Sequence, residues 1–275
     1  MKYLFTIIFF ISLSFTQNYE DVVELKDGSI IKGIIIETKP NEYIKIKSGE
    51  NIFVYQIDQI NIIRKEEIEG YLFDDPHKSR YFFAPTATPI GLGNTYFRNT
   101  WVFFNSIGFS ISETMSAEIG ISAFPGGGID NQLKQLSYKY SIKKTENKWQ
   151  SSFGFLYIGQ IDFGGGFIFG SFTNGDNDNN ISITPGLGYF QTSDEGLEFS
   201  ENLTLVLSTK KRASNTLSLI SENWIFVSSG NFTFISNSGI RFFGKQLSVD
   251  FSWPFFLTSE SSFVGFPLIS FTYTF

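Results

Sequence analysis

Few residues in this 275-residue chain could carry covalent chemistry. Cysteine is absent and histidine occurs once, as His77, so the sequence offers neither a thiol nucleophile nor a disulfide framework. A hydrolase built on serine needs a histidine within hydrogen-bonding reach of the hydroxyl, and we place His77 in a polar linker outside the strands that follow. We therefore predict that the protein is not an enzyme.

Motifs for metals and cofactors are weak as well. His77 has only Asp74 and Asp75 as acidic neighbours, which is poor evidence for a metal site. The glycine runs at residues 126–128 and 164–166 lack the Lys-Ser/Thr ending and the strand-to-helix setting of a phosphate-binding loop. Residues 176–180 lack the glycine and the later glutamate of a calcium-binding loop. We predict no metal and no cofactor.

Composition separates the chain into two regions. The formal net charge is −6 and the isoelectric point is near 5.0, which argues against nucleic acid as a partner. Charged residues are dense before residue 80, whereas most of the 33 phenylalanines follow it. The first region is typical of a water-soluble domain, and the second of a β-rich protein with an aromatic, apolar surface.

The N-terminus has the pattern of a secretory signal peptide, which we assign to residues 1–16. Lys2 provides the positive start, an apolar run from Tyr3 to Leu13 follows, and Ser14 and Thr16 are small residues before the expected cleavage point. The alternative is a membrane anchor, but the apolar run is shorter than the roughly 20 residues that a spanning helix requires. The pattern therefore predicts an exported protein.

Residues 17–65 predict a small periplasmic β domain, and residues 66–79 a linker. An Asp27-Gly28 pair between apolar alternations is a strong hairpin signal, and short strands are expected at 22–25, 30–37, 43–47, 52–56 and 60–64. Five short strands in so few residues indicate a small SH3-like or Sm-like barrel. The segment from Asp21 to Glu37 also resembles a module found near the N-terminus of exported proteins of Bacteroidota and related bacteria, which implies a fold and no activity.

From residue 80 onward, apolar residues alternate with small or polar ones. Such period-2 alternation is the signature of a sheet with one dry and one wet face. The final strand ends in this pattern, with Phe271, Tyr273 and Phe275 alternating with threonines up to the last residue. This ending resembles the assembly signal of outer-membrane barrels. We therefore predict an all-β fold in which residues 80–275 form an antiparallel transmembrane β-barrel.

The predicted barrel has about 12 strands. We expect strands to begin near residues 80, 94, 116, 132, 148, 163, 179, 197, 215, 231, 245 and 262, an even number as bacterial single-chain barrels require. Ten strands are the alternative, because the first segment contains Pro85 and Pro89. Residues 80–87 and 96–105 also resemble a recurring opening of a poorly characterised family of outer-membrane barrels from Bacteroidota-like bacteria, which implies fold and location only.

Charged residues on the polar face are candidates to line the lumen. Six of them are Glu118, Lys139, Lys143, Glu198, Arg241 and Asp250. Mixed charges could set selectivity in a narrow pore or pair across a sealed interior, and short loops favour the sealed form. The predicted function is a small passive channel or a binder of a small or apolar solute.

The alternative function is that of a structural or interaction protein of the cell envelope. In that case the periplasmic domain docks a protein partner and the barrel serves as its anchor. For either function we expect the outer-membrane lipid and the barrel-assembly machinery as partners.

Overall fold

The computed structural model describes residues 19–49, 51–67, 74–142, 149–160, 162–194, 196–228 and 231–275. The expected signal peptide, residues 1–16, lies outside these residues. Two compact units divide the chain, one within residues 14–72 and the other holding residues 73–275. Among the described residues there is no helix of the length and apolarity that crossing a membrane requires.

The N-terminal unit is a five-stranded antiparallel sheet in the order β4-β3-β2-β1-β5. All five expected strands are present, at β1 (Tyr19–Leu25), β2 (Ile30–Lys39), β3 (Tyr43–Ser48), β4 (Asn51–Gln56) and β5 (Ile60–Glu67), with a short 3-10 helix, η2 (Ile57–Gln59), before β5. The β1–β2 hairpin turns at Gly28, whose φ of 86° is favourable for glycine. Val23, Ile44 and Ile46 are fully buried in its core. In the described residues β4 and β5 are the sheet edges and do not pair, so the closure of an SH3-like or Sm-like barrel is not seen.

The C-terminal unit is a closed antiparallel barrel of twelve strands. Wall strands that follow one another in the sequence are neighbours in the sheet, and pairing of the last strand, β18, with the first, β6, closes the barrel. A further short strand, β17 (Ser262–Val264), pairs only with β16. The twelve wall strands are β6 (Thr95–Thr100), β7 (Phe104–Ser110), β8 (Met115–Ser122), β9 (Lys134–Ser141), β10 (Trp149–Gly159), β11 (Phe163–Gly175), β12 (Asn179–Thr192), β13 (Gly196–Ser214), β14 (Leu217–Ser228), β15 (Asn231–Phe243), β16 (Leu247–Thr258) and β18 (Leu268–Thr274).

Alternation along each strand separates a polar interior from an apolar exterior. In β18, Ser270 and Thr272 are buried at 2% and 1% exposure, whereas Phe271 and Tyr273 are 47% and 42% exposed. The outward face is aromatic and aliphatic on the other strands too, which is the pattern of a barrel whose outer surface faces lipid. The expected alternation and the all-β barrel are therefore confirmed.

The number of strands agrees with the expectation, but the first two strands do not. Residues 80–90 form no wall strand, and the single strand expected from residue 94 is instead the hairpin β6–β7. Its three-residue turn, 101–103, places Trp101 and Val102 at φ values of 51° and 67°, in the left-handed region that few side chains adopt. Glycine or asparagine normally marks such a turn, and neither is present at these two positions. The turn was therefore invisible in the sequence.

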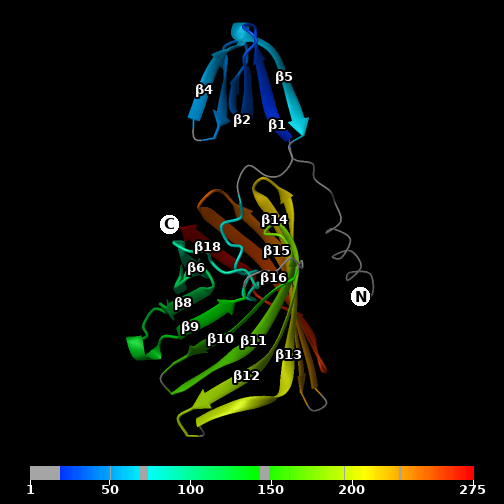
Figure 1. The fold of residues 1–275 in the computed structure, drawn as a ribbon. Coiled ribbons are helices and arrows are strands. Elements are labelled where there is room, and N and C mark those ends of the chain that lie inside the picture. The colour runs from blue at the N-terminus through cyan, green and yellow to red at the C-terminus, as the bar shows by residue number, and fades with distance from the viewer. Residues whose placement is uncertain are drawn as a thin grey trace. The chain divides into compact units, whose positions relative to one another are not determined.

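The segment before β6 lies inside the barrel, and we call residues 74–90 the plug. It enters at the end of the barrel that holds the C-terminus, since Phe275 and Thr95 are hydrogen-bonded to each other there, and Figure 1 draws it as the cyan trace within the ring of strands. The plug turns back on itself as a hairpin, with a bridge between Arg80 and Pro85. Tyr81, Phe82 and the plug alanines are almost fully buried.

Placing these residues in a linker and a first strand was therefore wrong. Two prolines lack the N–H that a wall strand would donate, which accounts for the absence of a strand at 80–90. The side chains of an eight-stranded barrel are enough to fill its interior, but a twelve-stranded barrel is wider and leaves space in the lumen. An inserted segment of chain occupies that space here.

Candidate functional site

Glu222, on the inner face of β14, holds the tip of the plug. One of its carboxylate oxygens accepts three backbone N–H groups, from Phe82, Phe83 and Ala84, at 3.0, 2.9 and 2.9 Å. The other oxygen accepts the indole N–H of Trp224 at 2.8 Å. Glu222 is fully buried, so these bonds replace water that the carboxylate and the three amides would otherwise bind.

Ion pairs hold the base of the plug to β13, β15 and β16, the strands on either side of β14. Asp75 accepts hydrogen bonds from Lys210 at 2.9 Å and from Arg241 at 3.3 Å. Arg241 also pairs with Asp250 at 2.6 Å, and Asp250 lies 3.4 Å from Arg80 of the plug. All five side chains are nearly inaccessible to solvent. Removal of one partner from such a buried network leaves an unpaired charge and is strongly destabilising.

Lys139, in β9, holds both arms of the plug hairpin. Its ammonium group donates to three plug carbonyls, those of Ser79, Thr86 and Thr88, at 2.8, 2.9 and 2.6 Å. The three donors of the lysine are thereby used. The plug is therefore hydrogen-bonded around the lumen by β9, β13, β14, β15 and β16.

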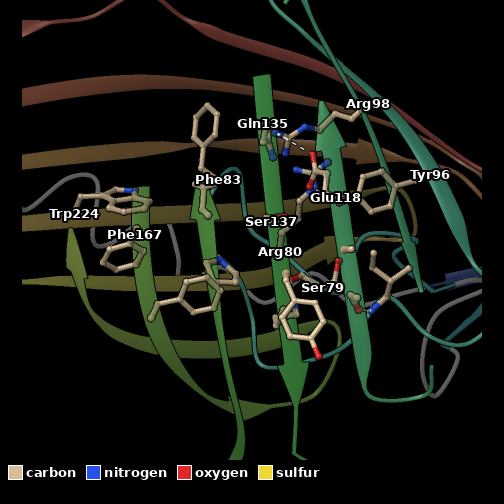
Figure 2. A pocket seen from close by; sticks show the side chains of 18 residues that line it. Ser79, Arg80, Phe83, Tyr96, Arg98, Glu118, Gln135, Ser137, Phe167 and Trp224 are labelled. Carbon is tan, nitrogen blue, oxygen red and sulfur yellow. Dashed lines mark hydrogen bonds and ion pairs between the residues drawn. The ribbon is translucent and has the colours of Figure 1, made fainter. Parts of the chain in front are cut away.

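A cavity of about 100 Å³ lies between the plug and the wall. Figure 2 shows Trp224 and Phe167 on one side of it and Arg98, Glu118 and Tyr96 on the other. The first side is aromatic and the second is charged. The whole cavity is lined by Ser79, Arg80, Phe83, Pro85, Ile90, Tyr96, Arg98, Ser116, Ala117, Glu118, Gln135, Ser137, Tyr138, Lys139, Leu156, Phe167, Phe169 and Trp224.

On the charged side of the cavity, Arg98 and Glu118 make few short hydrogen bonds. Arg98 lies 3.7 Å from Glu118, too far for a direct hydrogen bond, and donates to the carbonyl of Phe82 at 3.3 Å. Glu118 accepts a hydrogen bond from the hydroxyl of Tyr96 at 2.8 Å. The Nε of Arg98 and the second oxygen of Glu118 have no hydrogen-bond partner in the structure. These groups can bind a polar ligand.

Four of the six candidate lumen residues are buried among these contacts, namely Glu118, Lys139, Arg241 and Asp250. Lys143 lies outside the described residues. Glu198 is exposed, in a part of β13 that precedes its pairing with β14 at Thr204. The register of β12 against β13 shifts between Leu203 and Phe199, so Glu198 lies beyond this irregularity, near the start of the strand.

The C-terminal residues Phe271, Tyr273 and Phe275 all lie on the exposed outer face of β18 or directly after it. That location is where lipid would contact a transmembrane barrel. Whether they act as the assembly signal stays a prediction.

Sequence reasoning missed Asp75, Arg80, Lys210 and Glu222. Glu222 carried a usable signal, because it is the one charged residue in the sequence of β14 and has the parity of the polar face. Lys210 has that parity as well, but it stands in a run of three cations with Lys211 and Arg212. Asp75 and Arg80 carried none, because a polar segment next to a domain boundary is indistinguishable from a linker until its partners are known.

His77 was expected in a linker outside the barrel, and that expectation is wrong. It is 1% exposed and its ring meets the ring of Tyr96 edge-on at 5.3 Å. Neither of its ring nitrogens has a hydrogen-bond partner in the structure, so no serine–histidine pair is formed there. Across the described residues, no group of three or more His, Cys, Asp or Glu side chains is arranged to hold a metal.

Comparisons with known proteins give structural likenesses of low similarity. No protein-family model and no curated protein matches the chain. Among solved structures, the chain is similar to the KdgM porin in complex with disordered oligogalacturonate, at 8% identity over 66% of this chain and 98% of that chain, with a TM-score of 0.44. It is also similar to a loop-deletion mutant of OmpT, an outer-membrane protein of Vibrio cholerae, at 10% identity over 94% of this chain and 97% of that chain, with a TM-score of 0.39. The barrel assignment itself rests on the strand pairing described above.

Proposed function

We propose that the protein is an outer-membrane β-barrel that is closed by its own plug and binds a small solute in the cavity beside it. The observation that carries this proposal is the occupied lumen, in which the plug is hydrogen-bonded to β9, β13, β14, β15 and β16 and to further wall strands such as β6 and β11. An open passive channel would need a continuous aqueous path at this level. A solute-binding barrel with a closed lumen is therefore favoured over a permanently open pore.

Location in the outer membrane is supported by the apolar outer face and the polar interior of a closed barrel. The C-terminal end of β18 and the segment that connects the plug to β6 lie at the same end of the barrel, because Phe275 is hydrogen-bonded to Thr95 at the start of β6. In a bacterial barrel with its termini on the inner side, this end faces the periplasm, as does the N-terminal unit that leads into the plug. No step of the proposed function makes or breaks a covalent bond.

Single-channel recording in planar bilayers tests the closed state. The purified full-length protein is compared with Glu222→Gln, which weakens the plug tip, and with Glu260→Gln, a matched change in an exposed turn. We expect no steady conductance from the parent and from Glu260→Gln, and intermittent openings from Glu222→Gln. Heat-modifiable gel migration verifies that each barrel is folded. Steady conductance from the folded parent would contradict a lumen closed by the plug.

A second candidate function is docking of a periplasmic protein by the N-terminal unit, and an unpaired sheet edge favours it. Strand β4 is an edge among the described residues, and Ile52 and Val54 on it are 56% and 52% exposed. Such an edge accepts an extended strand of a partner by backbone pairing. A photo-crosslinking residue at Val54 should capture one defined envelope protein, and Ile52→Pro, which removes an N–H from the free edge of the same strand, should abolish the product. Crosslinks that persist unchanged in Ile52→Pro would oppose strand pairing.

A further inference from the structure

The charges that line the cavity do not balance. Three cations, Arg80, Arg98 and Lys139, face one carboxylate, Glu118. Arg80 lies near Asp250, but that carboxylate also accepts two hydrogen bonds from Arg241. Lys139 is bound by plug carbonyls, and no ion pair to it is recorded among the described residues. The wall of the cavity is therefore electropositive.

Arg98 is the lining cation with the fewest contacts, because Arg80, whose Nε is also unpartnered, donates to two plug carbonyls and to Thr272. Arg98 is 5% exposed, and it makes one hydrogen bond at 3.3 Å, an ion pair at 3.7 Å and a contact with the ring of Phe83 at 6.0 Å, with the Nε unpartnered. Arg241, by contrast, donates at 2.6 Å to both Asp250 and a plug carbonyl. A buried guanidinium with open donors binds a carboxylate in a bidentate manner.

The other side of the cavity accepts an apolar group. The rings of Phe167 and Trp224 lie 5.7 Å apart, and Phe83 at the plug tip lines the same space. The volume of about 100 Å³ is of the order of the roughly 150 Å³ apolar cavity known to admit benzene. One ring or a short branched chain is therefore the size of group that fits.

We infer that the cavity binds a small organic anion, with its acidic group on Arg98 and its ring or short apolar chain against Phe167 and Trp224. This inference rests on the proposed function, since it names the class of solute that the cavity takes. A zwitterion would use Glu118 as well, but it would leave the excess positive charge of the wall uncompensated. A cationic solute would add to that excess.

Three probes of one shape and different charge test the inference. Benzoate, benzamide and benzylamine are titrated into the purified full-length protein, with tryptophan emission as readout and Trp224→Phe to assign the signal to the cavity. We expect benzoate to bind at least about tenfold more tightly than benzamide, because a charge-assisted hydrogen bond is worth more than a neutral one. Benzylamine should bind weakest.

Variants then assign the charge to Arg98. Arg98→Gln should reduce benzoate affinity about tenfold or more and leave benzamide affinity nearly unchanged, whereas Arg64→Gln, on the N-terminal unit, should change neither. Equal affinities of benzoate and benzamide in the parent, or an Arg98→Gln barrel that is folded and still prefers benzoate, would overturn the inference. If benzamide or benzylamine binds and benzoate does not, the inference of an anionic ligand is overturned, whereas the proposed function of solute binding stands. Failure of all three probes to bind would reject the binder itself.

Discussion

Exchange of Glu222 for glutamine should loosen the plug without removing volume from the lumen. In the parent, one carboxylate oxygen accepts three plug N–H groups within 3.0 Å. Hydrogen bonds to a charged group contribute about 1.5–3 kcal/mol each, and a neutral amide retains part of each. A net loss of about 2–4 kcal/mol in plug docking follows. Since 1.4 kcal/mol is a factor of ten, the undocked fraction should rise about 30-fold or more.

Thiol labelling measures that fraction, because the chain has no cysteine of its own. Ala87 is fully buried in the plug, so a cysteine placed there reacts with a maleimide only when the plug opens. We expect labelling of Ala87→Cys to be at least about 30-fold faster with Glu222→Gln and unchanged with Glu260→Gln. Equal labelling rates in barrels shown to be folded by heat-modifiable migration would refute the reasoning.

Other perturbations separate the plug, the lipid face and the N-terminal unit. Lys139→Met leaves three plug carbonyls without a donor, and should lower the free energy of unfolding in urea by about 2–3 kcal/mol, a loss that Lys139→Arg should partly restore. Phe271→Arg places a charge on the outer face of β18 and should cost about 2–4 kcal/mol in lipid vesicles, whereas Phe271→Leu should cost far less. Hydrogen bonds from Lys45, and then from Tyr43, hold the pKa of Glu37 below its ordinary value of 4.5. Its stabilising contribution is therefore present above that pH and is lost as pH falls through the lowered pKa, so Glu37→Gln should flatten the acid limb of N-terminal unfolding measured by circular dichroism.

Much of the wall was predictable because burial on a barrel strand is decided residue by residue. The alternation in β18 places serine and threonine inside and aromatic residues outside, and only that register keeps charge away from lipid. Glu118, Lys139, Arg241 and Asp250 follow the same rule, and their inward parity could be read directly from the sequence.

The plug could not be predicted in the same way, because its contacts are between residues distant in sequence. Arg80 meets Asp250, and Asp75 meets Lys210, yet no local pattern connects these positions. Pro85 and Pro89 were a warning against a wall strand. The even strand count was then recovered only because one unrecognised hairpin at Trp101 and Val102 compensated for the strand that does not exist.

The most direct test of the account is a disulfide between the plug and the wall. The backbone N–H of Ala87 donates to the hydroxyl of Thr173 on the inner face of β11 at 2.8 Å, so cysteines at these two positions approach the spacing that a disulfide requires. The control pairs Ala87→Cys with Phe172→Cys, whose side chain lies on the outer face. The account predicts that the Ala87–Thr173 pair crosslinks in isolated outer membranes and that the control pair does not. Absence of the crosslink, with both single cysteines freely labelled in a folded barrel, would contradict a plug inside the lumen.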